Sequence, residues 1–304
     1  MSLSGPTPPM PIAPETTRPH LALYEAVQRA LTALPSFFRS DLVISGVLAT
    51  DLFTFNTSLG ATIESQVVEG LNELREMWDP ERHYVNYRFV RQSQQFPDVI
   101  LRSVANASDI VMGIELKGWY VLAKEGEPSF RYRVTPAVCA PQDLLVVFPW
   151  ALSQVTSGSP QLFPPYIEGA RNAALKRNDH WQTKKGKGDN GIKLSSSTQS
   201  YPKKSEPISD VPNSDSGDNF GRFARTGLMD AYITILFSEE LSGIPLWAWQ
   251  KFFAIFDDKR TDAKIERKLG DLARQWAKTR VESDEFAEQL FLQLQALLTL
   301  LQKK

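Results

Sequence analysis

Two nearly uninterrupted apolar runs place the strongest constraint on how this chain can fold. Residues 110–119 read Ile-Val-Met-Gly-Ile-Glu-Leu-Lys-Gly-Trp, and residues 144–148 read Leu-Leu-Val-Val-Phe. A strand that is apolar on both faces has to be covered on both faces, which is typical of the central strands of a sheet enclosed by helices. The sequence therefore predicts an α/β fold.

Hydrophobic periodicity predicts the elements around these two strands. Apolar residues at helical spacing predict a helix over 21–34 that ends at Pro35, and a second helix over 58–78. Alternating residues predict a strand over 84–90, and a second short strand is predicted over 97–101. Pro149 is expected to end the strand at 144–148. Further helices are predicted over 166–180, 220–236 and 246–256, and from 261 to the end.

Composition along the chain predicts four parts. The first 19 residues are rich in Pro, Ser and Thr, and residues 182–219 are rich in Lys, Ser, Gly, Asp and Pro with almost no apolar periodicity. We therefore expect a disordered lead-in over 1–19, a core over 20–181, a basic mobile loop over 182–219, and a helical C-terminal part over 220–304 packed on the core.

The composition excludes several classes of protein. The single cysteine, Cys139, cannot form a disulfide within the chain, and with only three scattered histidines it does not predict a zinc site. The N-terminal residues lack the basic start and apolar stretch of a secretory signal, and no apolar run approaches the roughly 18 residues needed to span a membrane. We expect a cytoplasmic protein without a membrane partner. The net charge of −1 neither indicates nor excludes nucleic acid, because binding depends on where basic residues cluster.

Three charged side chains interrupt the apolar strands. Asp98 directly follows Pro97, and Glu115 and Lys117 lie two residues apart, so both project from the same face of their strand. If the strands at 97–101 and 110–119 pair as a hairpin, Asp98 lies beside Glu115. Neighbouring carboxylates repel each other unless a cation offsets the repulsion, and Mg²⁺ readily takes two carboxylates, a main-chain carbonyl and waters. The pattern therefore predicts a Mg²⁺ site formed by Asp98, Glu115 and the carbonyl of Leu116.

Lys117 would lie next to such a metal. It can orient or deprotonate a metal-bound water, or stabilise charge in the transition state. In the alternative interpretation, Asp98 caps a turn, and Glu115 and Lys117 form a surface pair. The apolar neighbours Ile114 and Leu116 weaken that alternative, because a charged pair in a central strand needs a reason.

The pattern Pro97-Asp98 followed by Glu115-Leu116-Lys117 resembles the PD-(D/E)xK signature of restriction-endonuclease-like nucleases. That family often carries a glutamate in a helix before the first core strand, and Glu64 stands at about this place. The resemblance covers roughly residues 58–150. It implies a mixed sheet core flanked by helices, Mg²⁺ as cofactor, and Asp98, Glu115, Lys117 and Glu64 as catalytic residues. It also implies double-stranded DNA as substrate, a homodimer that matches a palindromic site, and a cognate DNA methyltransferase as partner.

Basic residues gather after the predicted core. A mobile basic segment can bind phosphates, but the same composition is also typical of a solvated loop. Arg222 and Arg225 share a helical face and can either bind phosphate or pair with acids such as Asp230 or Glu239. The residues predicted to contact nucleic acid are Lys184, Lys185, Lys187, Arg222 and Arg225.

These observations together predict a Mg²⁺-dependent endonuclease that hydrolyses DNA, most simply a sequence-specific type II restriction enzyme. One alternative is a structure-specific repair or junction nuclease on the same fold. Another is a DNA-binding protein that keeps the fold without catalysis, against which the complete set of Asp98, Glu115 and Lys117 argues.

Overall fold

The chain divides into two compact units. The computed structural model describes residues 20–46, 52–92, 94–123, 125–184, 189–255, 261–280 and 292. One unit comprises Met1–Tyr120 and Glu127–Leu236, and the other comprises Val121–Gly126 and Phe237–Lys304. Residues 1–19, predicted to be a disordered lead-in, lie outside the described residues.

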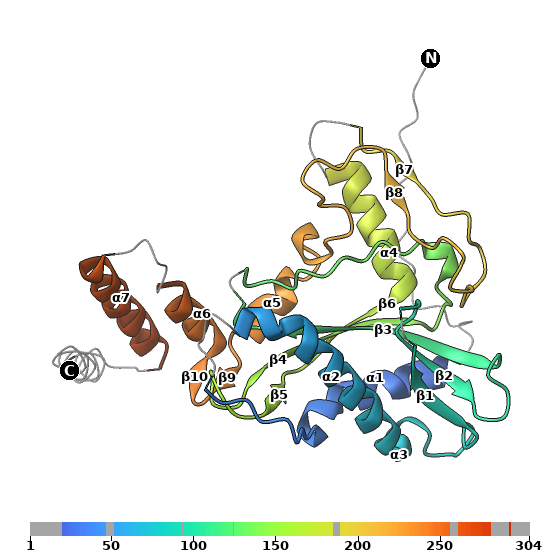
Figure 1. Cartoon of the computed structure of the whole chain (residues 1–304), viewed down its shortest axis with the longest axis horizontal. Helices are drawn as coiled ribbons and strands as arrows, with labels where there is room; N and C mark the ends of the chain where they lie inside the picture. The colour runs from blue at the N-terminus through green and yellow to red at the C-terminus, as the bar shows by residue number, and fades with distance from the viewer. Residues whose placement is uncertain are drawn as a thin grey trace. The chain divides into compact units, whose positions relative to one another are not determined.

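The first unit is a mixed α/β structure built on a six-stranded sheet (Figure 1). The strand order is β1-β2-β3-β4-β5, and β6 pairs with β4 as well. The pair β3–β4 is parallel, whereas β1–β2, β2–β3, β4–β5 and β4–β6 are antiparallel. The strands are β1 (Tyr87–Arg91), β2 (Val99–Ser103), β3 (Ile110–Tyr120), β4 (Leu144–Leu152), β5 (Pro160–Leu162) and β6 (Tyr166–Gly169).

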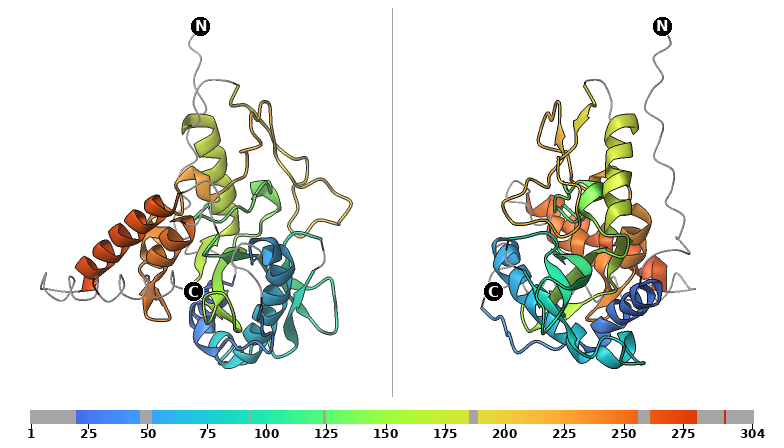
Figure 2. Two further views of the ribbon diagram at one scale, coloured as in Figure 1. Left: turned by 60° about the vertical axis from the view of Figure 1, so that its left-hand side comes forward. Right: turned by 90° about the vertical axis from the view of Figure 1, so that its right-hand side faces the viewer.

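Helices cover both faces of this sheet, as the two apolar runs require. All nine residues of β4 are buried, as are eight of the eleven residues of β3. In the views of Figures 1 and 2, α1 and α2 lie over one face and α4 lies over the other. These helices and the short helix that follows α2 are α1 (Leu21–Phe37), α2 (Leu52–Glu73), α3 (Arg75–Trp78) and α4 (Ala170–Asp179). The apolar stripe of α1, from Leu23 to Leu34, is buried, and each fully buried Leu or Val of this kind stabilises the fold by about 1.5–3 kcal/mol.

Residues 189–219 contact the rest of the first unit through side chains. The segment follows the π-helical turn η2 (His180–Lys184) along the chain and forms a two-stranded ladder of β7 (Ile192–Lys193) and β8 (Val211–Pro212). Asp210, next to β8, pairs with Arg177 of α4, with Oδ2 2.6 Å from a guanidinium nitrogen. The first unit also contains the 3-10 turns η1 (Pro136–Val138) and η3 (Ala224–Thr226), and the helix α5 (Asp230–Leu236).

The second unit contains a small hairpin and two longer helices. Its elements are β9 (Glu240–Leu241), β10 (Ile244–Pro245), α6 (Leu246–Ile255) and α7 (Asp262–Arg280). The prediction of helix over 246–256 is confirmed as far as Ile255, beyond which residue 256 lies outside the described residues. The predicted packing of the C-terminal part on the core stays a prediction for the residues of this unit. Among the described helices, none combines the length and the apolar character needed to cross a membrane.

Several predicted boundaries were wrong. The helix expected from residue 58 begins at Leu52, and α1 continues past Pro35 to Phe37. Pro149 does not end its strand. It lies opposite Trp119, and its carbonyl accepts a hydrogen bond from Phe163 N at 2.9 Å. The N–H that proline lacks would point to that same side, towards the short edge strand β5, so the parallel ladder with β3 is intact.

The helices predicted over 166–180 and 220–236 start later than expected. Tyr166–Gly169 pairs with Leu144–Val147 as a strand, because the free edge of β4 offers hydrogen bonds that a helix start would leave unmade. In the second segment, Gly221 and Gly227 adopt φ values of 83° and 78°, a left-handed conformation that interrupts a helix. Regular α-helix therefore begins only at Asp230.

Candidate active site

The pairing of β2 with β3 brings the predicted residues together. Val99 lies opposite Ile114, so the preceding residue Asp98 lies opposite Glu115. This confirms the predicted hairpin. The main-chain N–H of Leu116 donates a hydrogen bond to Asp98 Oδ2 at 3.1 Å, which fixes the Asp98 carboxylate against β3 just beyond the end of the β2–β3 ladder.

Lys117 joins the two carboxylates. Its Nζ lies 2.8 Å from Asp98 Oδ2 and 2.8 Å from Glu115 Oε1. The side chain of Glu115 is 10% exposed, and those of Lys117 and Asp98 are 23% and 27% exposed. The three groups therefore form a half-open cluster on one face of β3, not the freely solvated surface pair of the alternative interpretation.

Burial and repulsion make this cluster electrostatically unusual. Burial, with a smaller contribution from Asp98, raises the pKa of Glu115 to about 7, although Lys117 opposes that rise. Burial also disfavours the charge on Lys117, but Glu115 and Asp98 outweigh burial and raise the pKa of Lys117 above its ordinary value. The lysine is thus held as a cation, and burial disfavours the charge on Glu115.

Glu64 reaches the same cluster from helix α2. A Cβ on Gly118 would lie 3.5 Å from Gly60 Cα, so α2 lies close against β3 at this point. Glu64 follows Gly60 by one helical turn and projects from the same side of α2. Glu64 Oε2 lies 3.1 Å from a guanidinium nitrogen of Arg91 in β1. Burial and the nearby Asp98 raise the pKa of Glu64.

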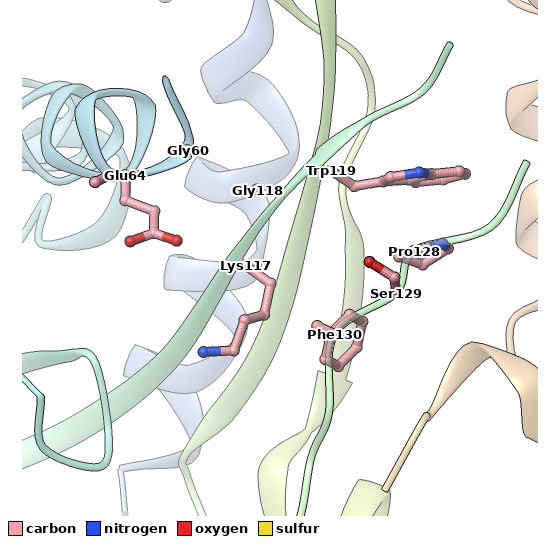
Figure 3. A pocket seen from close by; sticks show the side chains of 9 residues that line it. Gly60, Glu64, Lys117, Gly118, Trp119, Pro128, Ser129 and Phe130 are labelled. Carbon is pink, nitrogen blue, oxygen red and sulfur yellow. The ribbon is translucent and has the colours of Figure 1, made fainter. Parts of the chain in front are cut away.

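A cavity of about 350 Å³ opens beside Glu64 and Lys117. Figure 3 shows the side chains of Glu64 and Lys117 extending towards the same space next to β3, with Ser129 and Phe130 on a neighbouring segment that also lines the cavity. The cavity is lined by Gly60, Ala61, Glu64, Lys117, Gly118, Trp119, Pro128, Ser129 and Phe130. The segment 128–130 carries no sequence motif, so the sequence did not predict that it lines the cavity.

The donor set fits a divalent cation with oxygen ligands. Three carboxylates, of Glu64, Asp98 and Glu115, face the cations of Lys117 and Arg91, so negative charge is in excess. An N–H and a C=O of one strand residue point to the same side, so the carbonyl of Leu116 faces Asp98 as its N–H does. Within the described ranges, no group of three or more His, Cys, Asp or Glu could hold an ion. A metal here would rely on two carboxylates, a main-chain carbonyl and water.

Of the residues predicted to contact nucleic acid, Arg222 and Arg225 make contacts within the first unit. Arg225 pairs with Glu127 at 3.1 Å, and Arg222 Nε donates to the carbonyl of Asp218 at 3.3 Å. The sequence suggested Asp230 or Glu239 as acidic partners, and these two contacts are made to Glu127 and Asp218 instead. The side chain of Lys184 and the whole of Lys185 and Lys187 lie outside the described residues. Their roles stay predictions.

In comparisons with known proteins, no family model, no curated protein and no solved structure matched this chain.

Proposed function

We propose that this chain is a Mg²⁺-dependent DNA endonuclease of the PD-(D/E)xK type, with a restriction-endonuclease-like core and the sequence specificity of a type II restriction enzyme. The observation that supports the proposal most is the convergence of Asp98 and Glu115 on one ammonium group, with Lys117 Nζ 2.8 Å from each carboxylate. The residues that match the sequence motif are thus neighbours in space as well.

In this proposal, Asp98, Glu115 and the carbonyl of Leu116 hold Mg²⁺, and Glu64 supports the same shell. A bound Mg²⁺ would supply positive charge to the phosphate and acidify a water molecule. Hydrolysis adds that water across one P–O bond of the phosphodiester and gives a phosphate monoester and a free hydroxyl.

Lys117 lies next to both proposed metal ligands, with Nζ 2.8 Å from each carboxylate. From this position it would orient the attacking water, deprotonate it, or stabilise negative charge that develops in the transition state.

Cleavage of mixed plasmid and phage DNA tests the proposal. We expect discrete fragments with Mg²⁺ and none with EDTA, and Lys117→Ala is expected to lower the rate by about 10³-fold, or about 4 kcal/mol in activation free energy. A matched control is Lys176→Ala. It removes a lysine of α4 whose Nζ lies 2.6 Å from Glu168 Oε2, and it should leave the rate unchanged.

Other results of the same assay would favour other functions. Nicking or smearing with the same dependences would favour a repair or junction nuclease, and cutting that survives Lys117→Ala would refute the assigned site. Absence of cutting on many unmethylated DNAs would refute the nuclease and favour a DNA-binding protein. The homodimer and the cognate methyltransferase remain predictions that follow from the restriction-enzyme proposal.

A further inference from the structure

A distant loop returns to the face of β3 that carries the candidate site. Tyr201, in the segment between β7 and β8, donates its hydroxyl hydrogen to Asp143 Oδ1 at 2.8 Å. The same oxygen accepts the main-chain N–H of Gly113 in β3 at 2.7 Å, and Asp143 Oδ2 accepts the N–H of Ala140 at 2.7 Å. The loop is therefore tied through one buried carboxylate to the strand of Glu115 and Lys117.

The contact lies next to the site residues themselves. Gly113, Glu115 and Lys117 alternate along β3 and share a face. A Cβ on Gly113 would lie 2.5 Å from Pro97 Cγ and 3.1 Å from Tyr201 Cε1, so the two rings meet over this glycine. Gly113 precedes Glu115 by two residues, roughly 7 Å along the strand. The ring of Tyr201 thus packs beside the residue that precedes Asp98.

A second hydrogen bond holds the next residue of the loop. Gln95 Nε2 donates to the carbonyl of Pro202 at 3.1 Å, and Pro202 is buried. Gln95 belongs to the short segment that leads into Asp98. Tyr201 and Pro202 are therefore held on two sides, by the sheet and by the segment that carries a proposed metal ligand.

Two lysines follow this anchor directly. Lys203 and Lys204 are exposed and stand at a turn, where Glu206 N donates to the carbonyl of Lys203 at 2.9 Å. The nearby carboxylate of Glu206 is contacted by Gln199 Nε2 at 3.3 Å. An anchored turn presents ammonium groups at a defined place, so less conformational entropy is lost on binding than with free lysines.

We propose that the loop tip Tyr201–Lys204 is a phosphate-contact element of the candidate active site, in which Lys203 and Lys204 bind the backbone of duplex DNA beside the cleaved bond. The inference rests on the proposed nuclease function and adds a location to it, because the sequence shows Lys203 and Lys204 only as two members of a basic stretch and does not connect them to Asp98. Tyr201 and Pro202 position the two lysines and do not themselves contact the reacting atoms.

Binding of a labelled duplex in EDTA, followed by fluorescence anisotropy across a series of salt concentrations, tests the tip without cleavage. The variant Lys203→Ala/Lys204→Ala is expected to bind about tenfold more weakly, and the slope of log affinity against log salt should fall by about 2. Lys203→Arg/Lys204→Arg keeps both charges and should bind as the wild type does. Lys193→Ala, which removes an exposed lysine from β7 in the same segment, serves as a further control.

The anchor is tested with Tyr201→Phe, which removes one hydroxyl and no charge. We expect weaker binding with an unchanged salt slope, because the lysines remain but are held less well. Thermal melting of each variant establishes that the fold is kept. Equal affinity and slope for the double alanine variant and the wild type would refute the tip as a contact element.

Cleavage rates separate this inference from the proposed function. If the double alanine variant raises KM and leaves kcat unchanged, both proposals are supported. If the wild type cuts DNA and the variant cuts equally well at low substrate concentration, the tip proposal alone fails. Binding that depends on Lys203 and Lys204 but occurs without cleavage would refute the proposed nuclease function and support the phosphate contact. Absence of both binding and cleavage would refute both proposals.

Discussion

Two clusters of charged side chains lie within the first unit, and they differ in exposure, in charge balance and in hydrogen bonding. In one cluster, Arg177 donates to the carbonyls of Tyr132 and Val134 at 2.8 and 2.9 Å, and to Asp210 Oδ2 at 2.6 Å. The side chains of this Arg177–Asp210 pair are 1% and 0% exposed. The two charges of this pair cancel. The guanidinium also donates hydrogen bonds to two main-chain carbonyls.

The candidate site differs from that pair in each respect. Asp98 and Glu115 share the single ammonium of Lys117, and the three side chains are between 10% and 27% exposed. Glu64 adds a third carboxylate, whose pKa is raised by burial and by Asp98. A buried pair with balanced charge and saturated hydrogen bonds holds segments together, whereas a half-open cluster with excess negative charge is suited to bind a cation.

Removal of one member of the balanced pair should produce the largest change. We expect Arg177→Met to lower the free energy of unfolding by about 3–5 kcal/mol, because Asp210 is then left as a buried charge without its partner. Urea unfolding measures the change. Lys176→Met, which breaks a partly exposed pair with Glu168, is expected to lower it by less than about 1 kcal/mol.

A double variant tests whether the loss comes from the unpaired charge. Arg177→Met/Asp210→Leu removes both charges and should recover part of the stability. If Arg177→Met were as mild as Lys176→Met, Arg177 would not be a structural tie, and the contrast between the two clusters would fail.

The same contrast explains what could be predicted from the sequence. Asp98, Glu115 and Lys117 were predicted to meet because the period of two along a strand and the pairing of adjacent strands are local rules. Nothing in the sequence distinguishes Arg177 from the other basic residues near it. Its acidic partner lies 33 positions later, in a segment without apolar periodicity. The polar composition of residues 182–219 predicted a mobile loop. Composition carries no information about long-range contacts such as those of Tyr201 and Asp210.

The α/β class and the central strands also followed from local patterns. The edges of the sheet did not. Tyr166–Gly169 was predicted as helix, since four residues are too few for periodicity to distinguish the two structures, and only the free edge of β4 selects a strand. Pro149 was expected to end its strand, and the side to which its missing N–H points is a property of the assembled sheet.

A pH series should reveal the next largest effect, at the carboxylate that connects the loop to the sheet. Burial raises the pKa of Asp143 to about 7, although Tyr201, Ala140 and Gly113 donate hydrogen bonds to it. Since this pKa is higher in the folded than in the unfolded chain, stability is fully present below the unfolded value and is lost as pH rises towards 7. We expect the contribution of Asp143 to fall by about 3 kcal/mol between about pH 5 and pH 8.

Urea unfolding of the wild type and of Asp143→Asn across this range isolates that contribution, because asparagine does not titrate. The variant is expected to be less stable at low pH, since the amide of the asparagine cannot accept all three hydrogen bonds, but its stability should vary less with pH. Identical slopes for the two proteins would mean that Asp143 is ionised throughout, as its three donors favour.

The smallest expected effect is the stabilisation of the folded protein by Mg²⁺ bound at the candidate site. Mg²⁺ that binds only the folded protein should stabilise it by about 1.4 kcal/mol at ten times its dissociation constant. We expect a saturable rise of the melting temperature with Mg²⁺ for the wild type, and none for Asp98→Asn, which keeps a hydrogen-bond acceptor for Leu116 N but lacks the charge. Glu168→Gln removes a carboxylate that pairs with Lys176 and should keep the full response. A response that persists in Asp98→Asn would place the ion elsewhere. No response in the wild type would mean that the excess negative charge beside Lys117 does not bind Mg²⁺ without DNA, and would assign any metal to the complex with its substrate phosphate.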